Sequence, residues 1–279
     1  MNKRHSKKFI VSSLTLILCM LLPSAGLQSQ SSSPDFLKHF SWREIGPANP
    51  GGRITDIEGV ESNPYVIYAG AATGGIWKTE NAGTTWEPIF NDQPNASIGD
   101  IAISLSNPNI LFVGTGEPNN RNSSPWGAGV FKSTDAGKTW EFVGLKETNH
   151  IGRVLIDSKN PDIVYVAALG HLWGANDERG VFKTIDGGKT WDKVLFLDEK
   201  TGVTDLAMDP ENTSIFVAGS NIDNIYFSVD TGLTWERKVV ESSFGVWGDP
   251  CVVNGVDGEF YFFHLSNQPE GDWIDRIVC

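Results

Sequence analysis

An eight-residue pattern that recurs four times limits the folds open to this chain more than any other feature. Every copy reads Ser or Thr, any residue, Asp or Asn, any residue, Gly, any residue, Thr, Trp. The copies are TENAGTTW at 79–86, STDAGKTW at 133–140, TIDGGKTW at 184–191 and SVDTGLTW at 228–235. Their tryptophans stand 54, 51 and 44 positions apart, which is the length of a four-stranded propeller blade and not of a helical repeat. The spacing therefore predicts an all-β chain.

The residues around each octapeptide predict a turn between two strands. β-rich segments such as GVFKST and TWEFVG precede and follow the second copy, as in a hairpin. The Asp can accept hydrogen bonds from turn N–H groups, the Gly can adopt a positive φ, and the Trp can bury its rings against a neighbour. A calcium loop needs several oxygen ligands, so a structural role is favoured over calcium binding or catalysis. The structural residues are Asn81, Gly83, Trp86, Asp135, Gly137, Trp140, Asp186, Gly188, Trp191, Asp230, Gly232 and Trp235.

Each octapeptide belongs to a longer unit with four predicted strands. Asn-Pro or Asp-Pro pairs mark the first turn of a unit, and Val, Ile, Phe and Tyr dominate the strand that follows. FSWREIG, at 40–46, has the pattern of a fourth strand without its own blade, and we favour a piece of a longer propeller over a five-blade ring closed by this strand. The units cover about 51–90, 98–144, 151–197 and 202–240, with a partial blade at 247–279.

The octapeptide resembles the Asp-box (BNR) repeat of sialidase-like and sortilin-like β-propellers. From about 40 to 209, segments such as SIGDIAIS, VGTGEPN and NPDIVYVAALGHLWG are similar to secreted bacterial propellers of the YVTN/BNR type, which are often called glycosyl hydrolases. After about 213, SSFGVWGDPCVV and FYFFHLSN are more similar to another set of secreted sialidase-like propellers. The resemblance implies an all-β propeller of four-stranded antiparallel blades. The unmatched strand patterns at the two ends predict that it is incomplete, with four to five blades present. The resemblance also implies that the Asp-box turns lie away from the functional face.

The first 26 residues have the order of a secretory signal peptide. Basic MNKRHSKK precedes apolar FIVSSLTLILCMLL, and the small residues SAG at 24–26 suit a signal peptidase. The apolar run is short for a membrane span, so an uncleaved anchor is the lesser alternative. Residues 27–39 are expected to form a flexible leader before the propeller at 40–279. These features predict a secreted or periplasmic protein, with no membrane attachment in the mature form.

The charge of the chain excludes some classes of partner. The formal net charge is −12, and removal of the signal peptide, which carries four basic residues and no acidic one, makes it −16. Such an acidic surface argues against nucleic acid and anionic membranes as partners. The two mature cysteines, Cys251 and Cys279, could pair after export, and the sequence leaves this open. No C-x-x-C or His cluster suggests a metal, and no cofactor is expected.

The alternation of strands predicts two opposite faces. The octapeptide turns share one face with the first turn of each unit, which we call the turn face. The longest loops, at 46–53, 115–129, 144–153 and 170–180, share the other, which we call the loop face. Long loops on a rigid scaffold tend to carry function. The candidate ligand-binding residues are Arg53, Glu117, Arg121, Trp126, His150, Arg153, His171, Trp173 and Arg179, with Glu178 beside them.

Two functions fit these residues. The favoured one is a non-catalytic module that binds an extracellular or periplasmic peptide or glycan on the loop face. The alternative is a sialidase-like exo-glycosidase, in which arginines clamp a sugar carboxylate and a carboxyl group supplies acid/base catalysis. A sialidase-like site is expected to contain three arginines, an acidic Asp and a Tyr–Glu pair, whereas the sequence offers two candidate arginines, Arg53 and Arg153, at the start of innermost strands. The catalytic residues therefore stay unassigned.

Each candidate also has an ordinary structural interpretation. Arg53 and Arg153 could point into a central channel, or they could hydrogen-bond loop carbonyls, which we favour for each taken alone. His150 and His171 are interpreted as ordinary loop residues. Trp126 and Trp173 could be sugar-stacking platforms, and a role as packing anchors of their loops is as well supported.

Overall fold

The computed structural model describes residues 53–279, except 222–223, 244, 247–248, 256 and 268–273. The predicted signal peptide (1–26), leader (27–39) and closing strand (40–46) lie outside the described residues, as does most of the loop at 46–53. The described part is almost entirely β-structure, and its helical content is one 3-10 turn, Lys146–Thr148. No helix among the described residues is long and apolar enough to cross a membrane.

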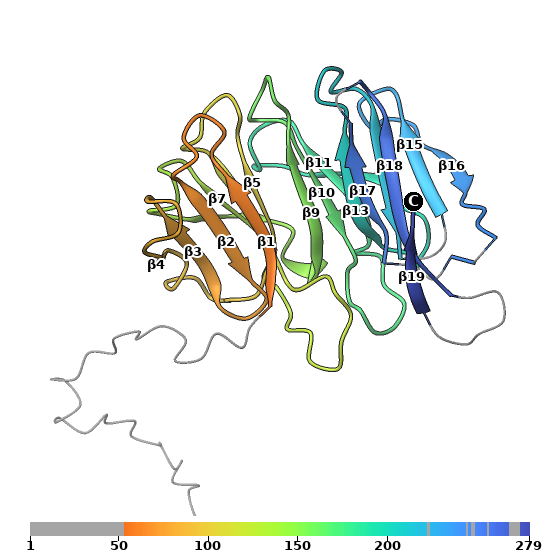
Figure 1. Ribbon diagram of the computed structural model, residues 1–279, viewed down its shortest axis with the longest axis horizontal. Coiled ribbons are helices and arrows are strands. Elements are labelled where there is room, and N and C mark those ends of the chain that lie inside the picture. Colours follow the sequence, from red (N-terminus) through yellow and green to blue (C-terminus); the bar gives the residue numbers. More distant parts are fainter. Residues whose placement is uncertain (1–52, 222–223, 244, 247–248, 256, 268–273) are drawn as a thin grey trace, which may run out of the picture. The chain divides into compact units, whose positions relative to one another are not determined.

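Five antiparallel sheets follow one another along the chain, and they are the blades of a β-propeller (Figure 1). Four sheets have four strands each, in chain order, and the fifth has three described strands. The first two blades comprise β1 Ile54–Gly59, β2 Ile67–Ala71, β3 Gly75–Thr79, β4 Glu87–Pro88, β5 Ile98–Ile103, β6 Leu111–Thr115, β7 Val130–Ser133 and β8 Glu141–Gly144. The others comprise β9 Ile151–Ile156, β10 Val164–Ala168, β11 Gly180–Thr184, β12 Asp192–Leu195, β13 Val203–Met208, β14 Phe216–Ser220, β15 Asn224–Ser228, β16 Glu236–Val239, β17 Cys251–Asn254, β18 Phe260–Asn267 and β19 Ile274–Val278. The predicted all-β propeller of antiparallel blades is thereby confirmed.

The apolar core lies between blades. The first strands of successive blades, β1, β5, β9, β13 and β17, contact one another in that order. One buried cluster joins Tyr68 and Ile76 of the first blade to Ile101 and Val113 of the second, and similar clusters join the second blade to the third and the third to the fourth. Burial of such side chains is worth about 1.5–3 kcal/mol each, so every blade depends on its neighbour for stability.

Carboxylates tie the innermost strands together across the blade boundaries. A carboxylate oxygen of one strand accepts the backbone N–H of the next, at 2.9 Å for Asp56 and Ile101, 2.7 Å for Asp100 and Val154, and 2.6 Å for Asp205 and Val252. The strands approach so closely that a Cβ added at Gly99 would lie 2.0 Å from the carbonyl oxygen of Ile151. Glycine is therefore required at this position.

The octapeptide turns are closed by their own side chains. Asp135 Oδ1 accepts the Ser133 hydroxyl at 2.8 Å and the Thr139 N–H at 2.9 Å, while Oδ2 accepts the Thr139 hydroxyl at 2.6 Å. These bonds, with that from the Thr139 hydroxyl foremost, lower the pKa of Asp135 to about 2. Ala136 and Gly137 both have positive φ, 59° and 87°. The turns at Asp186 and Asp230 have the same hydrogen bonds.

The same turns also join neighbouring blades, through a lysine latch. The latch lysine lies on the third strand of one blade, and its ammonium group donates a hydrogen bond to the backbone carbonyl of the fourth octapeptide residue in the next blade. The bonds run from Lys78 to Ala136 (3.3 Å), from Lys132 to Gly187 (3.1 Å) and from Lys183 to Thr231 (2.9 Å). Each ammonium also lies 5.1–5.5 Å from the ring centroid of an aromatic residue on the adjacent strand, namely Tyr68, Phe112 or Tyr165.

Two octapeptide tryptophans complete the junction in the opposite direction. Trp140 Nε1 donates to the carbonyl of Ile89 in the preceding blade at 2.9 Å, and Trp191 Nε1 donates to that of Val143 at 2.7 Å. Trp235 differs, because its Nε1 donates to Gly232 within its own turn. The turn face is therefore occupied by blade-to-blade contacts.

Candidate functional site

The two faces are separated as the strand order predicts. On the turn face, the first turn of a blade bonds the octapeptide turn, as Ala136 N–H does to the Asn109 carbonyl at 3.0 Å. On the loop face, the loop after the second strand bonds the segment before the first, as Leu169 N–H does to the His150 carbonyl at 2.9 Å. Both pairings occur in all four four-stranded blades. The long loop of the second blade also meets the segment before the third blade, because the Gly127 N–H donates to the Asn149 carbonyl at 2.7 Å.

Arg53 and Glu117 form an ion pair between the first two blades. Arg53 Nε donates to Glu117 Oε1 at 2.7 Å, and its Nη2 contacts Oε2, so the guanidinium engages the carboxylate with two nitrogens. The Glu117 side chain is fully buried, whereas that of Arg53 is partly exposed. The hydrogen bond to Glu117 raises the pKa of Arg53. Both oxygens of the buried carboxylate are thus occupied by the guanidinium, so Glu117 holds Arg53 in place.

His150 is buried behind this pair. Its Nδ1 lies 2.8 Å from the backbone carbonyl of Glu117, so Nδ1 carries the proton and donates it. Its Nε2 is buried without a hydrogen-bond partner in the described part of the chain. Burial lowers the pKa of His150, which keeps the ring neutral. Its interpretation as an ordinary loop residue is too weak, because it connects the second blade to the third.

His171 is the hub of the third-blade loop. Its Nδ1 lies 3.1 Å from Glu178 Oε2, and its Nε2 lies 3.2 Å from the amide nitrogen Nδ2 of Asn149. Because an amide nitrogen is a donor, Nε2 of His171 accepts this hydrogen bond. Nδ1 therefore carries the ring hydrogen, and its N–H donates a hydrogen bond to the Glu178 carboxylate. The His171 carbonyl accepts from Arg179 Nη2 at 2.6 Å and from Asn176 Nδ2 at 3.0 Å. Four neighbours thus fix one residue.

Three candidates sit more openly on these loops. Trp126 contacts the His171 ring in a nearly perpendicular arrangement, with centroids 6.1 Å apart, and is 62% exposed. Trp173, two residues from His171, is 69% exposed. Arg121 is exposed, and its recorded hydrogen bonds are all made by its backbone: its N–H donates to the Ser124 hydroxyl, and its carbonyl accepts from the same hydroxyl and from the Ser124 N–H. Trp126 and Trp173 therefore place aromatic surface near His171. The Arg121 guanidinium has no recorded contact with His171 among the described residues.

Arg153 is the one candidate that the structure places away from the loops. It takes the innermost-strand position that Asp56, Asp100 and Asp205 hold in other blades. Its Nε donates to Asp205 Oδ1 at 2.7 Å and its Nη1 to Asp100 Oδ1 at 3.2 Å. Burial lowers the pKa of Arg153, but the two carboxylates raise it further, so the net shift is upward. Within the described residues, the side chains of Arg53 and Arg153 bond carboxylates and not the loop carbonyls favoured from the sequence.

Several residues of the site were not singled out from the sequence. Asn149 and Asn176 hold His171, and Asp100 and Asp205 hold Arg153. The sequence did contain a pattern that could have identified the two aspartates. The equivalent innermost-strand segments GDIAIS, VTDLAM and GRVLID have Asp100, Asp205 and Arg153 at the same position. For the asparagines the pattern was only weak. Asn149 has a positive φ of 55°, which Asn tolerates better than most residues.

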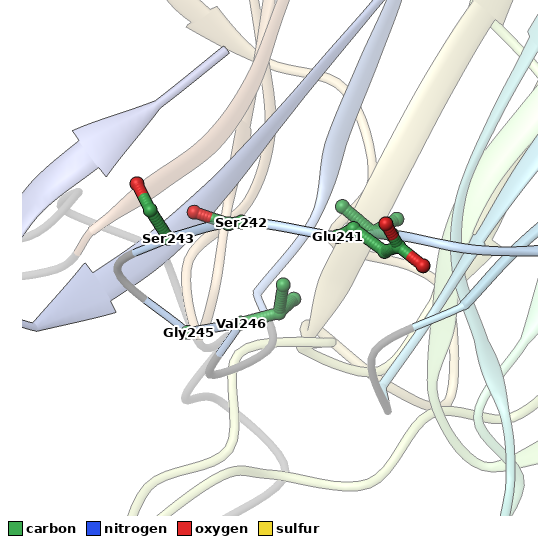
Figure 2. A pocket seen from close by; sticks show the side chains of 6 residues that line it. Glu241, Ser242, Ser243, Gly245 and Val246 are labelled. Atoms are coloured by element: carbon green, nitrogen blue, oxygen red, sulfur yellow. The ribbon is translucent and has the colours of Figure 1, made fainter.

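A second polar group lies among the innermost strands, where burial raises the pKa of Glu58 to about 7 and that of Asp100 well above its ordinary value. A wide, shallow pocket of about 520 Å³ is lined by Glu241, Ser242 and Ser243 with Val240, Gly245 and Val246, but it contains none of the candidates (Figure 2). No group of three His, Cys, Asp or Glu side chains among the described residues is placed to hold a metal. Cys251 and Cys279 are both free and exposed. The loop-face cluster therefore remains the candidate site.

Comparison with known proteins finds xyloglucanases among the relatives of this chain. No family model matches the chain. It is 24% identical to the xyloglucanase Xgh74A of Acetivibrio thermocellus over a region covering 91% of this chain and 34% of that enzyme. It is also 24% identical to a xyloglucanase of Paenibacillus sp., covering 82% of this chain and 25% of that enzyme. The chain is similar to xyloglucanases. It spans about a third or less of the length of these relatives.

Solved structures agree on the fold. An ancestral GH74 enzyme superposes with a TM-score of 0.66 at 22% identity, covering 81% of this chain and 29% of that one. The GH74 xyloglucanase from Xanthomonas campestris gives 0.60 at 18% identity, covering 81% and 36%. At such identities the likeness shows the propeller fold alone.

Proposed function

We propose that this protein binds a neutral polysaccharide of the xyloglucan type on its loop face and takes part in its hydrolysis, as part of a glycoside hydrolase propeller. The observation that carries the proposal is the similarity to several xyloglucanases over most of the chain. It favours the glycosidase alternative of the sequence analysis over a general binding module. It also changes the expected substrate, because the names of these relatives refer to xyloglucan and not to sialosides.

The charges of the loop face support a neutral ligand. A sugar carboxylate is held by free guanidinium groups, but Arg53 is engaged by Glu117, and Arg179 donates to the His171 carbonyl. Arg153 is engaged by two aspartates among the innermost strands. Of the four candidate arginines, Arg121 alone keeps its guanidinium unengaged within the described part of the chain. A three-arginine clamp for an acidic sugar therefore has no support here.

A second candidate function is binding without hydrolysis. Glu117 is buried in its ion pair and Glu178 faces His171, so the carboxylates of the cluster serve the loops. A glycosidase needs a pair of carboxyl groups free to act on opposite sides of the bond that is cleaved. The described loop face thus supports binding more directly than cleavage.

One set of measurements tests the proposal. The purified full chain is titrated with xyloglucan and its oligosaccharides by calorimetry, with sialyllactose as the acidic comparison. Release of reducing ends is followed in parallel. We expect saturable binding of xyloglucan and none of sialyllactose. Binding of the acidic sugar, or of neither sugar, would overturn the proposal, and reducing-end release separates hydrolysis from binding alone.

A further inference from the structure

Trp126 stands on a loop whose backbone is held at successive residues. Its carbonyl accepts from Asn95 Nδ2 at 2.5 Å, and the next N–H, of Gly127, donates to the Asn149 carbonyl at 2.7 Å. The Ala128 N–H donates to the Thr115 hydroxyl at 2.7 Å. A Cβ added at Gly127 would lie 2.3 Å from the Thr115 carbonyl oxygen, so the loop packs closely on the strand end. The backbone that carries the exposed Trp126 side chain is therefore held in one position.

The Trp126 side chain does not behave as a packing anchor. Trp140 and Trp191 show what such an anchor looks like here, because both are partly buried and give their indole N–H to the preceding blade. Trp126 is 62% exposed, and its indole N–H has no hydrogen-bond partner within the described residues. Buried Trp residues usually find such a partner. The interpretation of Trp126 as a loop anchor therefore loses its support.

The His171 ring is the recorded aromatic neighbour of the Trp126 indole. The two rings meet at 87°, so the contact leaves at least one face of the Trp126 indole open. The His171 ring cannot turn freely, because Glu178 engages Nδ1 and Asn149 engages Nε2. Its backbone is held as well, through the carbonyl that Arg179 and Asn176 share. The orientation of Trp126 is therefore supported by a fully bonded neighbour.

Trp173 adds a second exposed aromatic surface beside the same hub. It is 69% exposed. The following carbonyl, of Gly174, accepts from Arg179 Nη2 and from Asn176 Nδ2, both at 3.2 Å. Arg179 and Asn176, which bond the His171 carbonyl, thus also hold the backbone next to Trp173.

We propose that Trp126 is a stacking platform for one sugar ring of a neutral polysaccharide, that His171 is its positioning residue, and that Trp173 supplies a second stacking position. This inference rests on the proposed function and names its binding site. An indole offers an apolar face for a pyranose ring and an N–H donor at its edge for a hydroxyl group. Aromatic surface with few, fixed polar groups is the usual lining of a ligand site.

The test measures affinity for xyloglucan oligosaccharides by calorimetry, using the full chain and single variants. Trp126→Ala is expected to weaken binding roughly tenfold, which is the lower end of the range for loss of a nucleic-acid base stacked on an aromatic side chain, and Trp173→Ala is expected to weaken it as well. Trp126→Phe, which keeps an aromatic face, should lose less than Trp126→Ala. Tyr65→Ala is the matched control, because Tyr65 is also 62% exposed but belongs to the turn face, next to Ala82. Its affinity should equal that of the parent.

The role of His171 needs a measurement that follows Trp126 itself. With 5-fluorotryptophan incorporated, the ¹⁹F resonance assigned by Trp126→Phe should broaden or shift in His171→Ala, while the Trp173 resonance stays nearer its original position. An unchanged Trp126 resonance would refute the positioning role. Thermal melts confirm that each variant folds.

The outcomes separate this inference from the proposed function. If the parent binds xyloglucan and Trp126→Ala binds it equally well, the platform is wrong and the proposed function stands. If the parent binds no neutral glycan, the proposed function fails and the platform fails with it.

Discussion

At the scale of single residues, hydrogen bonds within the octapeptide explain its spacing. Asp135 bonds Ser133 two positions before it and Thr139 four positions after it. The first copy shows which part of the Asp is needed. Asn81 Oδ1 accepts the Thr79 hydroxyl and the Thr85 N–H, both at 2.9 Å, while its Nδ2 donates to the Thr85 hydroxyl. The acceptor at Oδ1 is therefore the shared requirement, and the charge is not.

Substitution of Asp135 tests this distinction. Asp135→Ala removes the acceptor and should lower the free energy of unfolding by on the order of 1 kcal/mol. Asp135→Asn keeps an acceptor, as Asn81 does, and should cost clearly less. Urea unfolding followed by tryptophan fluorescence measures both, and exposed Asp92→Ala serves as the control. Equal losses for the Ala and Asn variants would show that the charge matters more than the acceptor.

At the scale of elements, the octapeptide turns of the second, third and fourth blades each connect two blades. The latch lysine of one blade reaches the turn of the next, and in the fourth blade the corresponding position is occupied by Phe227 instead of Lys. The hydrophobic clusters span the same boundaries. The unit of stability is therefore a junction between blades and not a single sheet, as expected for repeats that contact only their neighbours.

Removal of one latch tests the junction. Lys132→Met keeps the apolar stem but loses the ammonium that bonds Gly187 and lies over Phe112, and it should destabilise the chain by about 1 kcal/mol. Hydrogen exchange should quicken in the turn at 184–191 more than in the turn at 133–140. Exposed Lys138→Met is the control. If both turns respond equally, the latch is not local and the interpretation is wrong.

At the scale of the described propeller, Arg153 connects three blades. It lies on β9 and pairs with Asp100 on β5 and Asp205 on β13. Burial raises the pKa of Asp100 well above its ordinary value, and the Arg153 charge opposes that rise. The arginine therefore compensates carboxylates that also accept backbone N–H groups of the next strands.

Loss of this arginine should be severe. Arg153→Ala leaves two buried carboxylates uncompensated, which typically costs about 3–5 kcal/mol. Addition of Asp100→Asn and Asp205→Asn should recover part of the loss, because the unpaired charges disappear. Arg121→Ala, at an exposed guanidinium, should change the stability by less than about 0.5 kcal/mol. A loss for Arg153→Ala no larger than that of the control would contradict this role.

The candidate site could be predicted from the sequence only in part. The strand order was enough to place Glu117, Trp126, His150 and His171 on one face, because alternating strands leave no choice of face for a loop. Their partners could not be predicted. Asn149 and Asn176 act through loop conformations that no periodic pattern encodes. The pairing of Arg53 with Glu117 joins residues 64 positions apart, a distance over which sequence spacing carries no information on contact.

The sequence by itself determined the blade repeat, the turn chemistry and the antiparallel strand order, because these depend on hydrogen bonds and side-chain patterns within a few residues. Only the tertiary structure decided which charged side chains pair with one another and which side chains stay exposed. It assigned Arg153 to two aspartates among the innermost strands, Arg53 to a buried glutamate, and Trp126 to a supported but open position. The reason is physical: the pairing and exposure of a side chain depend on which distant segments the blade-to-blade packing brings beside it.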